Sequence, residues 1–254
     1  MVTFPPAAAQ QELQQFNTIV LDAGHGGKDI GAPHYLLSKD EKDIALGIVL
    51  KLGKILQDSM PELKVIYTRK TDVFIPLKER HEIANKAKAD LFISVHVNAT
   101  AGTRRSRATD ATGTETYVLG LHRNPQKSRA IENYGENFSE ESGLLDPNDP
   151  TTQILVAQYT QTFLSQSIEF ASLVEQNFEK QGRHSYGVRQ MGLEVLAGSV
   201  MPGVLVETGF INNPSDEEYL NSDIGQQQVA MSIYKAIKAY KAEYVNKKRL
   251  TTHK

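Results

Sequence analysis

The chain has 254 residues, and its 28 Lys and Arg against 30 Asp and Glu give a formal net charge of −2. Proteins that bind a nucleic-acid backbone are usually basic, so this balance argues against a nucleic-acid partner. The absence of cysteine excludes disulfides and thiolate metal sites, which leaves His, Asp and Glu as metal ligands. With 40% hydrophobic residues, the chain is long enough to bury the core of one large domain.

The two ends of the chain are expected to lie outside this domain, which we place at residues 17–244. No apolar run reaches the roughly 18 residues that a membrane span requires. Residues 1–16 lack an apolar signal sequence and indicate a flexible lead, of the kind left when a signal peptide is removed. Residues 245–254 are polar, and we expect them to form a disordered tail.

Between the two ends, short runs rich in β-branched residues predict strands, and amphipathic patterns predict helices. In chain order these are a strand at 18–21, a helix at 42–57, a strand at 65–68, a helix at 77–89, strands at 91–97 and 116–119, a helix at 154–178, a strand at 204–206 and a helix at 226–244. The alternation predicts an α/β fold, a single domain with a mostly parallel twisted sheet covered by helices on both faces. It breaks at residues 122–168, which are polar and acidic at first, and there we predict a helical insertion.

The first strand ends abruptly in a glycine-rich turn that carries His25. Open α/β sheets bind ligands outside the carboxyl ends of their strands, and glycine lets a ligand or backbone approach closely. The alternative is a phosphate-binding turn, which requires G-x-G-x-x-G at the start of a helix. The glycines at 24, 26, 27 and 31 do not have that spacing. We therefore predict that His25 is a metal ligand.

Glu41 lies where the second predicted element begins, and two interpretations compete. Ser38 and Glu41 fit the S-x-x-E capping box, in which the Glu only satisfies a backbone N–H. Alternatively, the carboxylate faces the same strand ends as His25 and binds a metal. The local pattern by itself favours the cap.

His96 and Glu207 each lie near the end of an apolar strand. Strand alternation places Ser94, His96 and Asn98 on one face, where His96 is either a site residue or a hydrogen-bonded structural histidine. A carboxylate at the end of a buried strand needs a cation, a metal or a proton, and a salt bridge to arginine is the alternative for Glu207. Two His and one carboxylate would leave a tetrahedral Zn²⁺ one position for water, and a second carboxylate could move protons.

These motifs resemble those of the zinc-dependent N-acetylmuramoyl-L-alanine amidases, over residues 19–240. The matching segments are 21–27, 41–42, 65–69 with Asp72, 94–99 and 206–213. The resemblance implies that His25, Glu41 and His96 bind one Zn²⁺ and that Glu207 is the catalytic acid/base. It also implies the substrate, peptidoglycan, cleaved between the lactyl group of muramic acid and L-alanine.

The segment 122–168 resembles the regulatory insertion of division-associated, periplasmic members of this family. In those proteins a helix covers the zinc site until an activator protein displaces it, which implies export to the periplasm or cell envelope. Glu132 and Glu136 lie one helical turn apart, and either could reach the metal. The alternative is a charged surface helix that touches no metal.

Three further residues could bind substrate. Arg69 and Arg80 could pair with substrate carboxylates, or form buried structural ion pairs, and Asn98 lies beside His96. Two other functions stay open, because the same groups would serve a zinc carboxypeptidase or other peptidase that acts on stem peptides. A noncatalytic peptidoglycan-binding protein would be expected to lack a ligand or Glu207, and none is missing.

Overall fold

The structure, a computed structural model, describes residues 16–101, 108–134 and 149–252. Its strands form one six-stranded sheet in the order β2-β1-β3-β6-β4-β5. The strands are β1 (Thr18–Ala23), β2 (Lys64–Tyr67), β3 (Leu91–Asn98), β4 (Thr114–Leu119), β5 (Ser185–Met191) and β6 (Gly203–Phe210). All neighbours pair in parallel except β4 and β6, which are antiparallel. The predicted α/β fold with a mostly parallel sheet is confirmed.

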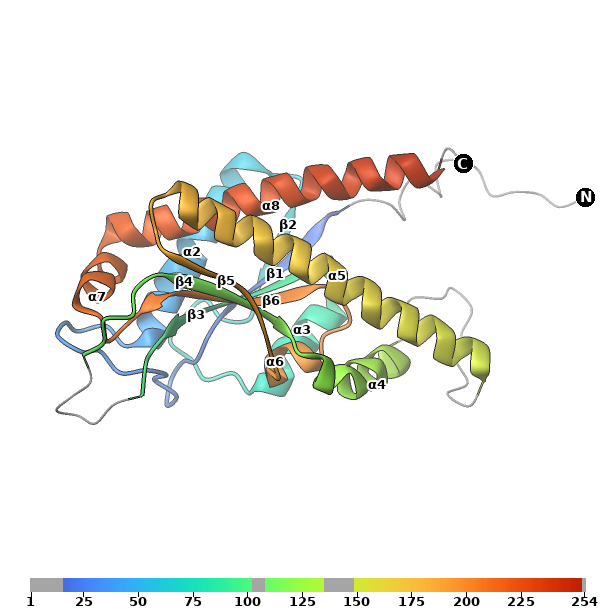
Figure 1. Cartoon of the computed structure of the whole chain (residues 1–254), viewed down its shortest axis with the longest axis horizontal. Helices are drawn as coiled ribbons and strands as arrows, with labels where there is room; N and C mark the ends of the chain where they lie inside the picture. The colour runs from blue at the N-terminus through green and yellow to red at the C-terminus, as the bar shows by residue number, and fades with distance from the viewer. Residues whose placement is uncertain (1–15, 102–107, 135–148, 253–254) are drawn as a thin grey trace, which may run out of the picture.

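Helices cover both faces of the sheet (Figure 1). They are α2 (Glu41–Ser59), α3 (Leu77–Lys86), η1 (Leu121–Arg123), α4 (Asn124–Tyr134), α5 (Pro150–Lys180), α6 (Glu194–Ala197), α7 (Pro214–Asn221) and α8 (Asp223–Thr252). The larger core cluster joins α2, α5 and α8 to one face, and the smaller one joins α3, α4 and α6 to the other. No helix within the described ranges combines the length and hydropathy of a membrane span.

Side chains alternate along β3, so one face of the strand is apolar and the other becomes polar toward the end of the strand. Ile93, Val95 and Val97 pack into the larger cluster under α2, α5 and α8. Phe92 packs into the smaller cluster on the opposite face, and Ser94 and His96 follow it on that face toward the end of the strand. The polar side chains therefore lie at the carboxyl ends of the strands, which α3 and α6 do not cover.

The structure differs from the sequence-based expectations in three elements. The edge strand β5 was not predicted, because its polar sequence lacks the apolar run of a central strand. Helix α8 continues to Thr252, through most of the segment expected to be a disordered tail. Helix α5 begins at Pro150 and buries Val156 and Leu164 in the two core clusters, so this half of the predicted insertion belongs to the core.

Helix α4 is anchored by a buried lysine. The Nζ of Lys127 donates to Ser199 Oγ (2.8 Å) and to the Met201 carbonyl (2.9 Å), just before β6 begins. Only 5% of Lys127 is exposed, and burial lowers the pKa of its amine to about 7. The helix is thus fastened to the end of the sheet at which β6 starts.

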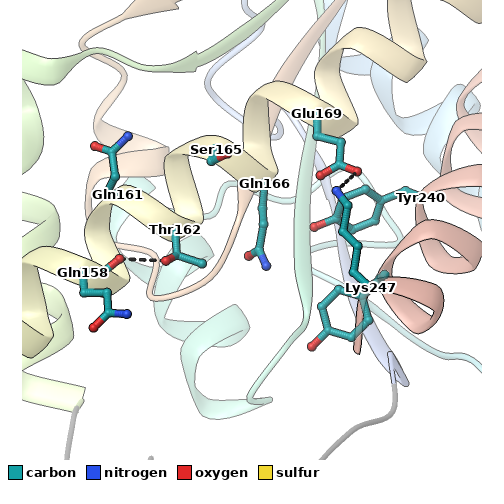
Figure 2. A pocket seen from close by; sticks show the side chains of 9 residues that line it. Gln158, Gln161, Thr162, Ser165, Gln166, Glu169, Tyr240 and Lys247 are labelled. Atoms are coloured by element: carbon teal, nitrogen blue, oxygen red, sulfur yellow. Dashed lines mark hydrogen bonds and ion pairs between the residues drawn. The ribbon is translucent and has the colours of Figure 1, made fainter. Parts of the chain in front are cut away.

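A hollow of about 600 Å³ lies between parts of α5 and α8, which pack against each other elsewhere along their length (Figure 2). Its walls carry mainly amide and hydroxyl side chains, among them Gln158, Gln161 and Thr162 of α5. Glu169 and Lys247 close an ion pair (2.5 Å) across it, and Phe16 packs edge-on against Tyr240 beside it. This hollow lies on the face of the sheet that α5 and α8 cover, whereas the side chains of His96 and Glu207 lie on the opposite face.

The pKa of Lys127 predicts a pH dependence of stability. Above about pH 7 the folded protein holds this amine neutral, while the unfolded chain keeps it protonated up to about pH 10. The unfolded state then binds more protons, so the free energy of unfolding of the wild type should rise with pH relative to Lys127→Met between pH 7 and 10. Urea unfolding of both proteins at pH 7 and pH 9 measures this difference. A difference that is independent of pH would contradict the assignment.

Candidate metal centre

The loop that carries His25 has an unusual backbone conformation. His25 (φ 58°), Gly26 (φ 126°) and Gly27 (φ 58°) all lie at positive φ, directly after β1. The amide of Gly24 still bonds to the Val95 carbonyl of β3 (3.0 Å), and Gly26 and Asp29 pair through two backbone hydrogen bonds. This turn directs the His25 side chain back toward the strand ends.

Two buried arginines hold this loop in place. Arg80 donates from Nη1 to Asp22 Oδ1 and to the Ala23 carbonyl (both 2.7 Å), and from Nη2 to the His25 carbonyl (2.6 Å). Arg69 donates from Nε to the Ala23 carbonyl (2.9 Å) and from Nη2 to the Gly24 carbonyl (2.7 Å). Only 2% of Arg80 and 3% of Arg69 are exposed. Their donors are used within the protein, which argues against substrate binding for both; Arg80 forms the buried ion pair, with Asp22, whereas Arg69 bonds to backbone carbonyls.

Glu41 is not part of the capping box of α2. That box is formed by Asp40 and Asp43, two residues after the pair expected from the sequence, Ser38 and Glu41. Glu41 occupies the first helical position and is 5% exposed. Its carboxylate turns toward the strand ends, which removes the cap interpretation.

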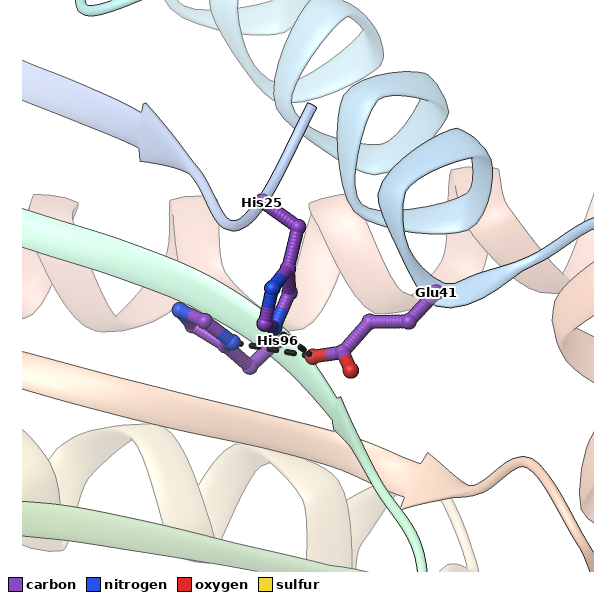
Figure 3. Close-up of side chains that lie close together, drawn as sticks. All are labelled: His25, Glu41 and His96. Atoms are coloured by element: carbon purple, nitrogen blue, oxygen red, sulfur yellow. Dashed lines mark hydrogen bonds and ion pairs between the residues drawn. The ribbon is translucent and has the colours of Figure 1, made fainter. Parts of the chain in front are cut away.

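Glu41 brings the two histidines together (Figure 3). Its Oε1 lies 2.9 Å from His96 Nδ1 and 3.1 Å from His25 Nε2, and its Oε2 accepts from the Ala32 amide (2.7 Å). Burial raises the pKa of this carboxyl, but the hydrogen bonds and charges of His25 and His96 outweigh burial and hold it well below its usual value. Glu41 is therefore held as an anion, the form in which a carboxylate can bind a metal.

The three side chains have the spacing of a metal site. Their ligand atoms all lie within 4.8 Å of one another, and no other such group occurs in the described part of the chain. Ligand atoms at roughly 2.0–2.2 Å from a tetrahedral zinc ion would be about 3.4 Å apart, close to the distances around Glu41. The glycines are required for this approach, because a Cβ at Gly24 would overlap the His96 ring, and one at Gly31 would lie 2.5 Å from Glu41 Oε2.

Glu207 lies beside this group on β6, paired in register with His96. Its Oε2 is buried and has no hydrogen-bond partner among the described residues. Burial, followed by the negative charges of Glu41 and Glu115, raises the pKa of Glu207 well above its usual value. The salt bridge to arginine considered from the sequence is absent among the residues that the structure describes. A carboxyl in this state can accept a proton and later donate it.

Glu115 on β4 was missed by the sequence analysis. It pairs in register with Glu207 from the other side, and its Oε1 accepts from Asn98 Nδ2 (2.5 Å) and Tyr117 OH (2.8 Å). Asn98, expected to bind substrate, thus donates to Glu115. The signal was present in the sequence, because Glu115 is a carboxylate within a buried strand, as is Glu207.

The two acidic residues of the predicted insertion do not join the metal group within the described residues. Glu132 lies on α4, which follows the end of β4 and is fastened by Lys127 at the start of β6. Because β4 and β6 are antiparallel, this is the end of the sheet opposite to Glu207. Glu136 lies outside the described residues.

Comparison with known proteins gives the family of the chain. Residues 19–239 match the family model described as N-acetylmuramoyl-L-alanine amidase. The chain belongs to this amidase family. Among curated members, AmiC of Escherichia coli is 33% identical over 231 residues, which cover 89% of this chain and 53% of AmiC. AmiA of E. coli is 30% identical over 91% of this chain and 78% of AmiA.

Solved structures of the amidase family share the fold. The crystal structure of the Clostridium difficile 630 amidase aligns with a TM-score of 0.65 and 26% identity, over 88% of this chain and 96% of that one. AmiC2 of Nostoc punctiforme aligns with a TM-score of 0.62 and 27% identity, over 89% of this chain and 98% of that one. The chain spans about half the length of E. coli AmiC and of Haemophilus influenzae AmiB (53% each).

The structural role of Arg80 predicts a large effect on stability. Arg80→Met would leave the carboxylate of Asp22, which is 0% exposed, without its cation. Removing one partner of a buried pair costs about 3–5 kcal/mol, and we expect a loss of this size in guanidinium unfolding. The exposed pair of Lys54 and Asp58 provides the control, because Lys54→Met should cost less than about 1 kcal/mol. Equal losses in the two variants would contradict this role for Arg80.

Proposed function

We propose that this chain is a zinc-dependent amidase that hydrolyses the bond between the lactyl group of N-acetylmuramic acid and L-alanine in peptidoglycan. The observation that carries the proposal is the group of His25, Glu41 and His96 with Glu207 beside it, whose Oε2 has no hydrogen-bond partner in the described part of the chain. Membership of the amidase family supports the same reaction. Such an enzyme serves cell-wall remodelling or the separation of daughter cells.

The metal ligands of this proposal are His25, Glu41 and His96, with one Zn²⁺ per chain. Two imidazoles and one carboxylate match the ligand sets of catalytic zinc, which keep a further position open. Zinc would supply a Lewis acid for the lactyl carbonyl and lower the pKa of water from 15.7 to about 7. Glu41 neutralises part of the added charge, and its contacts with both histidines keep the three ligands in position.

Glu207 performs the proton transfers of the proposed reaction. Its buried position keeps it a stronger base than an exposed carboxylate, so it can accept the proton of the attacking water. The same carboxyl can then return the proton to the amine of L-alanine as the amide bond breaks, because an unprotonated amine is a poor leaving group. The missing hydrogen-bond partner of Oε2 leaves this oxygen available for both steps.

The substrate places the proposed activity in the periplasm or cell envelope, where peptidoglycan lies. Regulation by the segment 122–168, with displacement by an activator protein, stays a prediction. In the described residues Glu132 is remote from the metal group, so a direct contact from this segment would have to involve another residue, such as Glu136. A peptidase that trims within the stem peptide is the alternative function, since it would use the same ligands.

The reaction is tested by digestion of purified peptidoglycan with the zinc-loaded protein. Mass spectrometry of the wild-type products should show intact stem peptides with a free L-alanine amine. Loss of a general acid/base costs roughly 10²- to 10⁴-fold in rate, so Glu207→Gln should release at least a hundredfold less while it retains zinc. Stem peptides cut internally would instead support the peptidase. No product from the zinc-loaded wild type would argue against both.

The ligand set is tested at Gly31, which lies at φ 67° against Glu41 and His25. Gly31→Ala should displace these side chains and weaken zinc binding by about tenfold to a hundredfold, measured by competition with a chromophoric chelator. Gly182 is a matched control, because it lies at φ 85° with nothing within 4 Å of a Cβ. Gly182→Ala should lower stability through the same backbone strain but leave zinc affinity unchanged. Equal zinc affinity in both variants would contradict the assigned ligands.

A further inference from the structure

A row of charged side chains crosses the sheet from the metal group toward its far edge. Glu207 on β6 pairs in register with Glu115 on β4, and the Glu115 charge is close enough to raise the pKa of Glu207. Glu115 Oε2 in turn lies 3.0 Å from Nε of Arg189, on the edge strand β5. Arg189 is therefore separated from the catalytic carboxyl by a single side chain.

The guanidinium of Arg189 is paired through Nε, while its two terminal nitrogens lie on the exposed side. Its Nε faces Glu115, and its Cζ lies 5.5 Å from the centre of the Tyr186 ring. Half of the side chain is exposed, at 50%. Within the described residues its two terminal nitrogens have no hydrogen-bonded partner. A guanidinium fixed through Nε can present both terminal N–H groups to a carboxylate in the paired geometry that arginine favours.

Arg189 supplies a positive charge beside this row. Glu115 is an acidic side chain that is 5% exposed, and it would repel a free carboxylate of an approaching peptide if no cation lay next to it. Arg69 and Arg80 cannot compensate, because their donors are used by backbone carbonyls and Asp22. Arg189 is exposed on the side of Glu115 remote from Glu207.

The spacing fits a peptide bound across the strands. Adjacent strands lie about 4.8 Å apart, so β5 is roughly 10 Å from β6. An extended peptide advances about 3.3–3.6 Å per residue. With its scissile amide at Glu207, a stem peptide that runs toward β5 brings the carboxylate of its second residue within reach of the long Arg189 side chain.

We propose that Arg189, oriented by Glu115, is a specificity residue that binds the carboxylate of the peptide residue following L-alanine. This inference rests on the proposed amidase function and adds the direction in which the peptide lies, from the metal group over β4 toward β5. The glycan side of the scissile bond then lies toward the apolar side chains of Phe74 and Leu77, which border His25 and His96.

The experiment compares two soluble substrates with the zinc-loaded protein, muramoyl-L-alanyl-D-glutamate and the same compound with the free α-carboxylate converted to an amide. The wild type should show a lower KM for the acid. A charge-assisted hydrogen bond of ordinary strength corresponds to about tenfold, so Arg189→Ala should raise KM for the acid about tenfold with little change in kcat. Its KM for the amide should change much less, and Arg189→Lys should fall between.

A matched control is Arg123→Ala, because Arg123 follows the opposite end of β4 and its side chain hydrogen-bonds only Gln126 among the described residues. This variant should keep the wild-type preference for the acid. Loss of folding in Arg189→Ala would lower kcat for both substrates equally, whereas the inference requires a change in their ratio. An Arg189→Ala protein that retains the wild-type ratio of acid to amide would overturn the inference.

Binding measured without turnover separates this inference from the proposed function. In the Glu207→Gln background, calorimetry with the same two compounds should give tighter binding of the acid, and Arg189→Ala should abolish the difference. A wild type that binds both compounds in this way but cleaves neither would contradict the amidase and retain the carboxylate site. Equal binding of acid and amide in the Glu207→Gln protein would overturn the site.

Discussion

The buried carboxylate of Asp22 is the constraint on which the rest of the site depends. It is 0% exposed and accepts hydrogen bonds from Thr68 and Arg80 at Oδ1 (2.6 and 2.7 Å) and from Ser94 at Oδ2 (2.6 Å). These donors come from the end of β2, from α3 and from β3. A charge without access to water must be fully paired, so the carboxylate fixes where these segments meet. His25 follows three residues after Asp22, so the junction that Asp22 holds together also fixes the position of His25.

The same arrangement explains how one sheet can both form a rigid core and present polar side chains at the ends of its strands. Parallel strands that are covered on both faces carry apolar residues along most of their length. In β3 the apolar residues Ile93 and Val95 continue on one face to the end of the strand, while the other face changes to Ser94 and His96. Reactive groups are thus built on strands whose opposite side is packed against α2 and α8, which limits their movement.

Much of the fold and the metal group could be predicted from the sequence, for identifiable reasons. Central strands are nearly continuous apolar runs, and His25, His96 and Glu207 interrupt or end such runs. The edge strand β5 has no such pattern, so its existence depends on pairing with β4. The capping box was misassigned because Asp40 and Asp43 have the same three-residue spacing as Ser38 and Glu41.

Other features could not be predicted because they depend on register and on backbone acceptors. The sequence does not reveal that Arg69 and Arg80 bond to carbonyls of residues 23–25, which are acceptors that every residue possesses. Likewise, Glu115 becomes a neighbour of Glu207 only through the antiparallel register of β4 and β6. A single buried carboxylate can be identified in a sequence, whereas the partner that it faces across a sheet cannot.

The reversed direction of β4 also sets a minimum length for the segment that follows it. The segment that follows β4 leaves the sheet at the end remote from His25, so it would have to run back along the whole strand to contact the group of His25, Glu41 and His96. Six residues of strand correspond to about 20 Å, a distance that six extended residues or about 13 helical residues can cover. A connection that follows β4 must therefore have at least this length to reach His25, Glu41 and His96 from the opposite end of the sheet.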